Sequence, residues 1–140
     1  MNAYPFPRSP KYLLRVKKCA SGFGIFAEED IPAHRFILEY WGKLVENKAA
    51  DQVGGRYLFD LENGKTVLGG TRKNIARYIN HACRPNAEVR ISKNRIFIYS
   101  TKRIKSGDQI GYDYGKEYFN YYIKPHGCLC KTCVKRRQKK

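Results

Sequence analysis

The sequence of 140 residues is poor in acidic side chains and contains no long apolar run. It has 12 Asp and Glu against 28 Lys and Arg, which gives a formal net charge of +16. No segment approaches the ~18 consecutive apolar residues of a membrane-spanning helix, and the first residues lack a signal-peptide apolar region. We therefore expect an intracellular protein. The positive charge attracts polyanions, so nucleic acid or a protein bound to it is an expected partner.

The sequence also lacks internal repeats and any linker long enough to divide two domains, so we expect one domain. A hydrophobic fraction of 42%, with 11 Tyr and 7 Phe, argues against disorder. Residues 1–10 carry three prolines and are typical of an irregular lead-in. The run 135–140 is mostly basic and fits either a solvated tail or a nuclear address.

Short runs with alternating apolar residues dominate the sequence between the lead-in and the basic run. This pattern predicts a mostly β domain built of small sheets. Asn63-Gly64 and Lys93-Asn94 each lie between such runs and predict hairpins. A tight turn is expected at 21–24. The expected strands are 11–18, 36–45, 56–61, 66–68, 87–92, 95–100 and 109–112, and the expected short helices are 49–55, 74–80 and 116–123.

The segment Gly22-Phe23-Gly24-Ile25-Phe26-Ala27 matches the glycine fingerprint of dinucleotide-binding folds. That reading requires a helix to begin here, with its N-terminus at a phosphate. Pro32 follows too soon for such a helix, and Glu28-Glu29-Asp30 would place three anions at the phosphate. We reject this reading. Two glycines still allow a backbone to approach a ligand closely, although a plain turn is the alternative.

Cysteine is scarce except near the C-terminus, where Cys128, Cys130 and Cys133 form a C-x-C-x-x-C pattern. Three cysteines within six residues favour a metal site over a disulfide framework. Tetrahedral zinc needs a fourth ligand. The candidates are Cys83, Cys19, His126 and His81.

Two further segments combine polar groups with aromatic rings. In 77–86, Asn80 and His81 offer donors and acceptors to a polar ligand, or else fix a loop through hydrogen bonds. In 111–115, Tyr112 and Tyr114 lie on the same side of an extended segment. Such tyrosines either line an apolar slot or belong to an ordinary core.

Taken in order and spacing, these segments resemble the SET-domain family of protein lysine methyltransferases, from about residue 12 to residue 133. The segment 80–86 (Asn-His-Ala-Cys-Arg-Pro-Asn) is the most specific match. The resemblance implies small β-sheets with short helices and a C-terminal pseudoknot. It assigns 11–123 to a SET domain and 124–140 to a zinc-binding post-SET segment with a basic tail.

The resemblance implies S-adenosylmethionine and zinc as cofactors. Tyr114, Tyr112 and Tyr40 would be the catalytic residues, and Cys83 would join Cys128, Cys130 and Cys133 on zinc, which leaves Cys19 as a free thiol. The cofactor-binding residues would be Gly22, Phe23, Gly24, Tyr57, Arg77, Asn80, His81, Tyr114, Tyr118 and Phe119. A tyrosine at position 112 favours mono- or dimethylation.

Two departures from the family pattern stand out: only two residues separate Cys130 from Cys133, where four are usual, and Ala82 replaces a serine.

The expected substrate is a histone or another basic nucleic-acid-associated protein. The expected location is chromatin in a eukaryote or the cytoplasm of a bacterium. Alternatives are a catalytically silent, basic zinc-containing module that binds nucleic acid or chromatin, and a scaffold that binds cofactor only. The segment Glu28-Glu29-Asp30 is a candidate contact for a basic peptide, or else a solvated loop.

Overall fold

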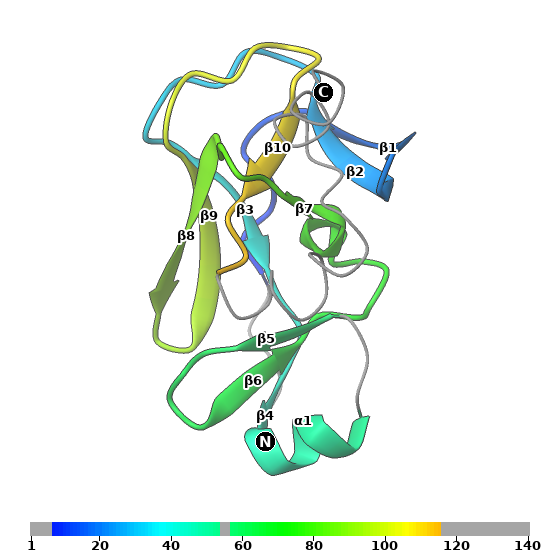
Figure 1. Ribbon diagram of the computed structural model, residues 1–140. Helices are drawn as coiled ribbons and strands as arrows, with labels where there is room; N and C mark the ends of the chain where they lie inside the picture. The colour runs from blue at the N-terminus through cyan, green and yellow to red at the C-terminus, as the bar shows by residue number, and fades with distance from the viewer. Residues whose placement is uncertain (1–6, 54–56, 116–140) are drawn as a thin grey trace.

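The computed structural model describes residues 7–53 and 57–115, and these form three small sheets with one short α-helix and one 3-10 helix (Figure 1). The predicted mostly β fold is confirmed. The strands are β1 (Leu14–Cys19), β2 (Gly22–Ala27), β3 (Phe36–Tyr40), β4 (Lys43–Glu46), β5 (Leu58–Asp60), β6 (Lys65–Leu68), β7 (Asn80–His81), β8 (Ala87–Ser92), β9 (Arg95–Ser100) and β10 (Gln109–Tyr112). The helices are α1 (Asn47–Val53) and the 3-10 helix η1 (Ile75–Tyr78).

The first sheet has the strand order β1-β2-β10-β7 and brings together segments that are far apart in the chain (Figure 1). β1 and β2 form an antiparallel hairpin, and β10 pairs antiparallel with β2, with Gln109 opposite Phe26. On its other side β10 pairs in parallel with the very short β7, so that Gly111 lies opposite Asn80 and Tyr112 opposite His81. This register places the Asn-His segment beside the Tyr112–Tyr114 segment.

The other two sheets are antiparallel and have the strand orders β3-β9-β8 and β4-β6-β5. β8 and β9 form one of the predicted hairpins, and its turn residues Lys93 and Asn94 have positive φ values of 52° and 63°. β5 and β6 form the other, with Gly64 at a φ of 88°. Asn63 Nδ2 donates to Asn94 Oδ1 over 2.8 Å, which joins the tips of the two hairpins.

The core between the sheets is dominated by isoleucine. β-Branched side chains pack well on pleated strands, and full burial of each stabilises the fold by roughly 1.5–3 kcal/mol. In β9, Ile96, Ile98 and Ser100 are buried while the residues between them are only half-buried, which is the period-two pattern expected of a strand. The fully buried isoleucines are Ile25, Ile31, Ile37, Ile96, Ile98, Ile104 and Ile110, and Ile79 is 1% exposed.

The predicted helix over 74–80 is a 3-10 helix that ends at Tyr78. The tight turn predicted at 21–24 does not occur. Cys19 pairs with Gly22, so the hairpin turns at Ala20 and Ser21 and β2 already begins at Gly22. Gly22 has a φ of 106°, which lets the strand leave this two-residue turn. Because β2 continues as a strand to Ala27, no helix begins at the glycines, in agreement with the rejection of the dinucleotide reading.

The run 36–45 forms two strands rather than one. β3 ends at Tyr40 and β4 begins at Lys43, and Gly42 between them lies against the backbone of β6. A Cβ atom at Gly42 would fall 1.8 Å from the Leu68 carbonyl oxygen, so only glycine fits this crossing.

Several sequence predictions fall outside the described residues. They are the helix over 116–123, the pseudoknot, and the residues Tyr118, Phe119, Cys128, Cys130 and Cys133. The division at residues 10 and 123 also stays a prediction. In the part of the chain that the structure describes, no helix is long and apolar enough to span a membrane.

Candidate active site

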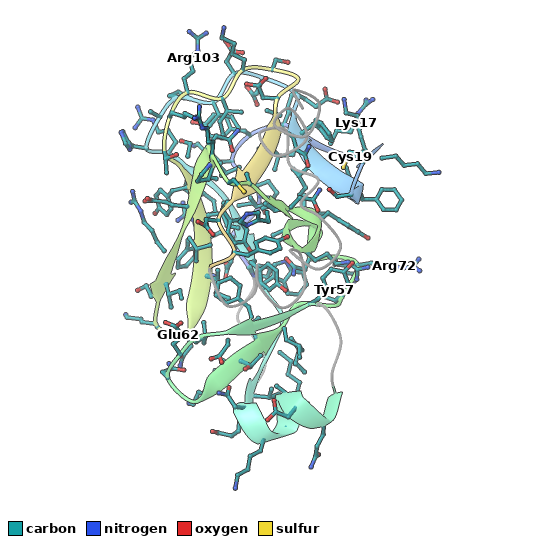
Figure 2. The ribbon with its side chains drawn as sticks, in the orientation of Figure 1. Lys17, Cys19, Tyr57, Glu62, Arg72 and Arg103 are labelled. Carbon is teal, nitrogen blue, oxygen red and sulfur yellow. The ribbon has the colours of Figure 1, made fainter. Side chains whose placement is uncertain are left out.

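The Asn80 side chain lies at the meeting point of β1, β2 and β10. Its Nδ2 donates to the Phe23 carbonyl oxygen over 2.8 Å and to Gln109 Oε1 over 2.9 Å. The sulfur of Cys19 lies 3.6 Å from the same nitrogen. Figure 2 shows Cys19 at the end of β1.

Gly24 makes this contact between strands possible. A Cβ atom at position 24 would lie 2.5 Å from Gln109 Oε1 and 3.1 Å from Asn80 Nδ2. Any larger residue would therefore push the two amide side chains away from β2. A Cβ atom at Gly22, by contrast, would meet nothing within 4 Å. Glycine is favoured there only because of the positive φ.

The Arg77 side chain extends from η1 and contacts two aromatic rings. Its guanidinium carbon lies 4.4 Å from the ring centre of Tyr57 and 4.8 Å from that of Tyr78, and its Nη1 donates to the Gly70 carbonyl. Cation–π contacts of this kind hold the planar group in a fixed orientation. Its Nε is buried and has no hydrogen-bond partner among the described residues. A buried donor without an acceptor is costly, which suits a site completed by a ligand.

His81 connects the tyrosine segment to a cysteine. Its Nδ1 accepts a hydrogen bond of 3.1 Å from the Tyr114 backbone N–H, so the ring proton belongs on Nε2, which lies 3.4 Å from Cys83 Sγ. Burial lowers the pKa of His81, and the Asp113 carboxylate 3.8 Å away opposes this only in part. The imidazole is therefore neutral near pH 7.

Tyr112 and Tyr114 lie together at the end of β10, with ring centres 5.1 Å apart. The Tyr114 ring also meets the His81 ring edge-on at 5.6 Å. The Tyr114 hydroxyl donates to the carbonyl oxygen of Ile79, the residue before Asn80. This hydrogen bond fixes the position of the Tyr114 hydroxyl relative to β7.

Tyr40 and Tyr57 are joined through Gly69. The backbone N–H of Gly69 donates to the Tyr57 carbonyl over 2.7 Å. A Cβ atom at Gly69 would fall 2.2 Å from the Tyr40 hydroxyl, so that hydroxyl rests directly on the glycine. The Tyr40 ring packs at 5.4 Å from Phe59 and belongs to the same apolar cluster as Tyr112 and Tyr114.

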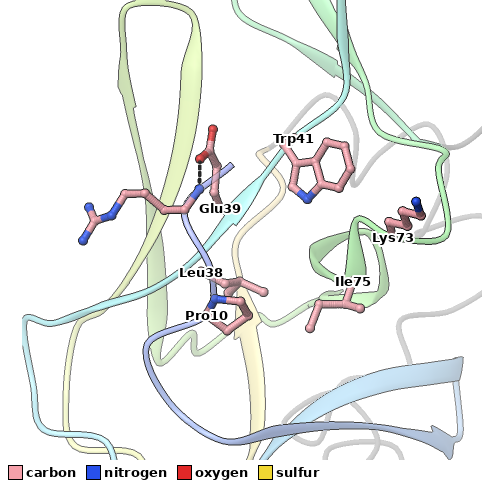
Figure 3. Close-up of a pocket in the computed structure, with 7 residues that line it drawn as sticks. Pro10, Leu38, Glu39, Trp41, Lys73 and Ile75 are labelled. Carbon is pink, nitrogen blue, oxygen red and sulfur yellow. Dashed lines mark hydrogen bonds between the residues drawn. The ribbon is translucent and has the colours of Figure 1, made fainter. Parts of the chain in front are cut away.

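A separate cavity of about 240 Å³ lies between the lead-in segment, β3 and η1 (Figure 3). Trp41, Lys73 and Ile75 line one side of it, and Pro10 and Leu38 the other. None of the predicted site residues lines this cavity.

Beside this cavity lies the buried carboxylate of Glu39. It accepts two hydrogen bonds from Arg95, at 2.9 and 2.7 Å, and a third of 2.9 Å from the Arg8 backbone N–H. A carboxylate with these partners is satisfied, which makes it a structural anchor. We therefore do not assign the candidate site to this cavity.

The structure thus brings Phe23, Gly24, Asn80 and His81 together with the Tyr112–Tyr114 segment, while their roles stay a prediction. Sequence reasoning missed Gln109, which bonds to Asn80, and Gly69, which supports Tyr40. Neither residue stands in a recognisable motif, because their neighbours are set by strand register. Cys83 is exposed, and no group of three metal-ligating side chains occurs within 7–53 and 57–115, so the zinc site stays a prediction.

Comparison with known proteins gives a family for this arrangement. Residues 22–115 match the model of the SET domain. The chain is 36% identical over 122 residues to histone-lysine N-methyltransferase EHMT1 of Mus musculus, a match that covers 78% of this chain and 9% of that protein. It is 34% identical over 127 residues to histone-lysine N-methyltransferase set-2 of Caenorhabditis elegans, covering 80% and 8%.

A third relative is the histone-lysine N-methyltransferase, H3 lysine-4 specific, of Schizosaccharomyces pombe. It is 35% identical over 104 residues, covering 65% of this chain and 11% of that protein. The chain therefore spans about a tenth of the length of these curated relatives. Since the family model covers more than half of the chain, including both the Asn-His and the tyrosine segments, the chain belongs to the SET-domain family.

Proposed function

We propose that this chain is an S-adenosylmethionine-dependent protein-lysine N-methyltransferase. The observation that carries the proposal is the parallel pairing of β7 with β10, with Tyr112 opposite His81. It sets the hydrogen-bonded Asn80 side chain close to a pair of buried or half-buried tyrosines. The relatives named above are all histone-lysine methyltransferases, which supports the same activity.

The residues around Asn80 fit the cofactor chemically. The cofactor's amino-acid end carries an ammonium and a carboxylate, and the buried Arg77 Nε is a donor without an acceptor among the described residues. Phe23 lies between two glycines, which lack Cβ atoms, so a ligand can approach its backbone closely. Gly22, Gly24, Tyr57, His81 and Tyr114 complete the described part of the proposed site. Tyr118 and Phe119 are proposed from the resemblance alone. When bound, S-adenosylmethionine supplies a methyl group on a positively charged sulfur.

The tyrosines supply positioning and desolvation. A lysine amine has a pKa near ~10.4 in water and must lose a proton before it attacks. An apolar aromatic channel walled by Tyr40 and Tyr57 disfavours the ammonium form by desolvation. The Tyr114 hydroxyl, held by its hydrogen bond to the Ile79 carbonyl, would lie beside the amine and orient it. With the cofactor bound, these residues would hold the amine in line with the methyl group, so that the N–C bond forms as the S–C bond breaks and S-adenosylhomocysteine leaves. The amine proton would pass to water, and such alignment is worth several orders of magnitude in rate.

We propose a histone, or another basic nucleic-acid-associated protein, as the substrate, and chromatin as the location in a eukaryote. The relatives act by name on histones, and the net charge of +16 suits a complex with DNA. The second candidate, a silent basic module, accounts for the charge. It leaves the tyrosine pair and the hydrogen bonds around Asn80 without a role.

We also propose a zinc site formed by Cys83 with Cys128, Cys130 and Cys133. Thiolates are the ligands that structural zinc prefers. The His81 Nε2–H, 3.4 Å from Cys83 Sγ, would donate to such a thiolate and keep it oriented. Metal analysis of the purified protein should give about one zinc per chain. A Cys83→Ser variant should bind zinc more weakly, whereas a Cys19→Ser variant should retain it.

The decisive experiment uses labelled S-adenosylmethionine with core histones, nucleosomes and a basic DNA-binding protein. We expect label on lysine, and a loss of about 100-fold or more in the Tyr114→Phe variant, which keeps the ring and removes only the hydroxyl. Cofactor binding without any transfer would favour the scaffold. Failure to bind the cofactor would favour the nucleic-acid module.

A further inference from the structure

The Asn80 carboxamide is held in one orientation by two acceptors. The Phe23 carbonyl oxygen and Gln109 Oε1 lie 2.8 and 2.9 Å from the same nitrogen. An amide nitrogen carries two N–H groups and an amide oxygen carries none, so the atom facing both acceptors must be Nδ2. Both N–H groups are then used, and no described residue donates to Asn80 Oδ1. The side chain therefore presents an acceptor, and only an acceptor, to a ligand.

Gln109 reaches Asn80 from the first residue of β10. The backbone positions of Gln109 and Phe26 are paired, and the side chain runs along β2 past Gly24, where it occupies the space a Cβ atom would need. The contact therefore depends on Gly24, as well as on the β2–β10 register. Cys19 is a weaker neighbour, because its sulfur is 3.6 Å from Asn80 Nδ2 and 3.9 Å from Gln109 Oε1.

We propose that Gln109 is a positioning residue of the cofactor site: it fixes the Asn80 amide so that Oδ1 is offered to the ammonium of the cofactor's amino-acid end. Without an acceptor at position 109, only the Phe23 carbonyl would hold the amide, and the flipped form would present N–H groups to a cation. This inference rests on the proposed use of S-adenosylmethionine. It adds to that proposal a residue that acts through Asn80.

The test compares Gln109→Met, which keeps the length but removes the acceptor, with Gln109→Glu, which keeps an acceptor. Cys19→Ala is the matched control for the weaker sulfur contact. Calorimetry should show S-adenosylhomocysteine binding about three- to tenfold more weakly to Gln109→Met, the range expected for one lost hydrogen bond. Gln109→Glu and Cys19→Ala should stay within about twofold of wild type.

A second ligand separates positioning from general damage. 5′-Methylthioadenosine has the same nucleoside but no amino-acid end, so Gln109→Met should leave its inhibition constant unchanged. In methyl-transfer assays the same variant should raise the KM for cofactor while kcat at saturating cofactor stays near wild type. Gln109 is exposed, so we expect the melting temperature to change by only a few degrees.

Three results would overturn the inference. The first is unchanged S-adenosylhomocysteine affinity in Gln109→Met, and the second is equal weakening of both ligands. The third is a loss in Gln109→Glu as large as that in Gln109→Met. In each case wild-type binding and transfer would still support the proposed function. If the wild-type protein binds neither ligand, the proposed function fails together with the inference.

Discussion

At the scale of single residues, the hydroxyl of Tyr112 is the group we expect to limit how many methyl groups are transferred. Tyr112 is 8% exposed and its ring centre lies 5.1 Å from that of Tyr114. Its hydroxyl, or a water held by it, takes space and orients the amine by hydrogen bonding. Tyr112→Phe should therefore shift the product from mono- and dimethyl-lysine toward di- and trimethyl-lysine.

Mass spectrometry of a methylated histone peptide measures this shift directly. Tyr99→Phe is the control, because Tyr99 lies on β9 and stacks against Arg90 outside the candidate site. An unchanged product distribution in Tyr112→Phe would remove the role assigned to its hydroxyl.

Gly69 gives a second prediction at this scale, because the Tyr40 hydroxyl lies where its Cβ would be. Gly69→Ala must displace the buried tyrosine, and overpacking of this kind costs about 1–3 kcal/mol of folding stability. We expect methyl transfer to fall at least about tenfold if Tyr40 walls the proposed lysine channel, since a small misplacement near the reacting groups is costly in rate. Affinity for S-adenosylhomocysteine should change little.

Gly70→Ala is a close control for this variant. A Cβ atom at Gly70 would meet nothing within 4 Å, so activity and melting temperature should stay near wild type. Equal activity of the two alanine variants would show that Gly69 does not position Tyr40.

At the scale of elements, Asp30 joins two loops that flank the first sheet. Its Oδ1 accepts the Ser106 backbone N–H over 2.9 Å, its Oδ2 pairs with Arg103 at 2.6 Å, and the adjacent Ile31 bridges to Ile104. Figure 2 shows Arg103 at the end of the molecule away from α1. The hydrogen bond from Ser106, followed by the Arg103 guanidinium, lowers the pKa of Asp30 below its ordinary value of 3.8.

Because the pKa is lower in the folded state, Asp30 stabilises the fold above pH 3.8 and loses this effect as the pH falls through the folded-state pKa. Asp30→Asn should thus lower the melting temperature by a few degrees at neutral pH and by progressively less in acid. Thermal denaturation across the acid range measures the difference. Asp51→Asn, an exposed change on α1, is the control and should show no such trend. A constant difference at all pH values would contradict the prediction.

The elements themselves differ in how far the sequence determines them. Hairpins close locally, and Asn63-Gly64 and Lys93-Asn94 mark the two turns, so both hairpins were predictable. The positive φ values in these turns lie at Glu62, Gly64, Lys93 and Asn94. The turn after β1 was missed because Gly22 marks the first strand residue after it. The two-residue β7 carries no periodic signal, and its parallel partner lies thirty residues along the chain.

The candidate site shows the same limit at the scale of the whole molecule. The resemblance of 77–86 and 111–115 to the family's motifs, rather than their residue types alone, predicts cofactor and channel chemistry. The contacts that position those residues, Gln109 with Asn80 and Gly69 with Tyr40, connect strands that are distant in sequence. Such contacts depend on register and on the space left by glycine, which one sequence does not reveal.

The whole molecule also carries an electrostatic conflict, because a protein of net charge +16 repels a basic histone peptide. The candidate acidic contact at 28–30 does not resolve it. Glu28 pairs with Arg15 at 2.6 Å, Glu29 accepts the Leu13 backbone N–H over 2.8 Å, and Asp30 pairs with Arg103. These carboxylates are already engaged within the domain. Attraction to DNA offers a physical route to a basic substrate, since it brings the enzyme beside DNA-bound proteins.

We therefore expect faster transfer to nucleosomes than to a free histone peptide at low salt, with opposite responses to added salt. Between 50 and 200 mM salt, the nucleosome rate at subsaturating substrate should fall by about tenfold or more, as counterion release weakens DNA binding. The peptide rate should hold or rise, because screening reduces the repulsion between two positive partners. Replacing the basic residues of 135–140 with serine should flatten the nucleosome slope and leave the peptide rate unaffected. Parallel salt curves for both substrates would mean that DNA takes no part in substrate capture, and that recognition lies wholly in the peptide channel.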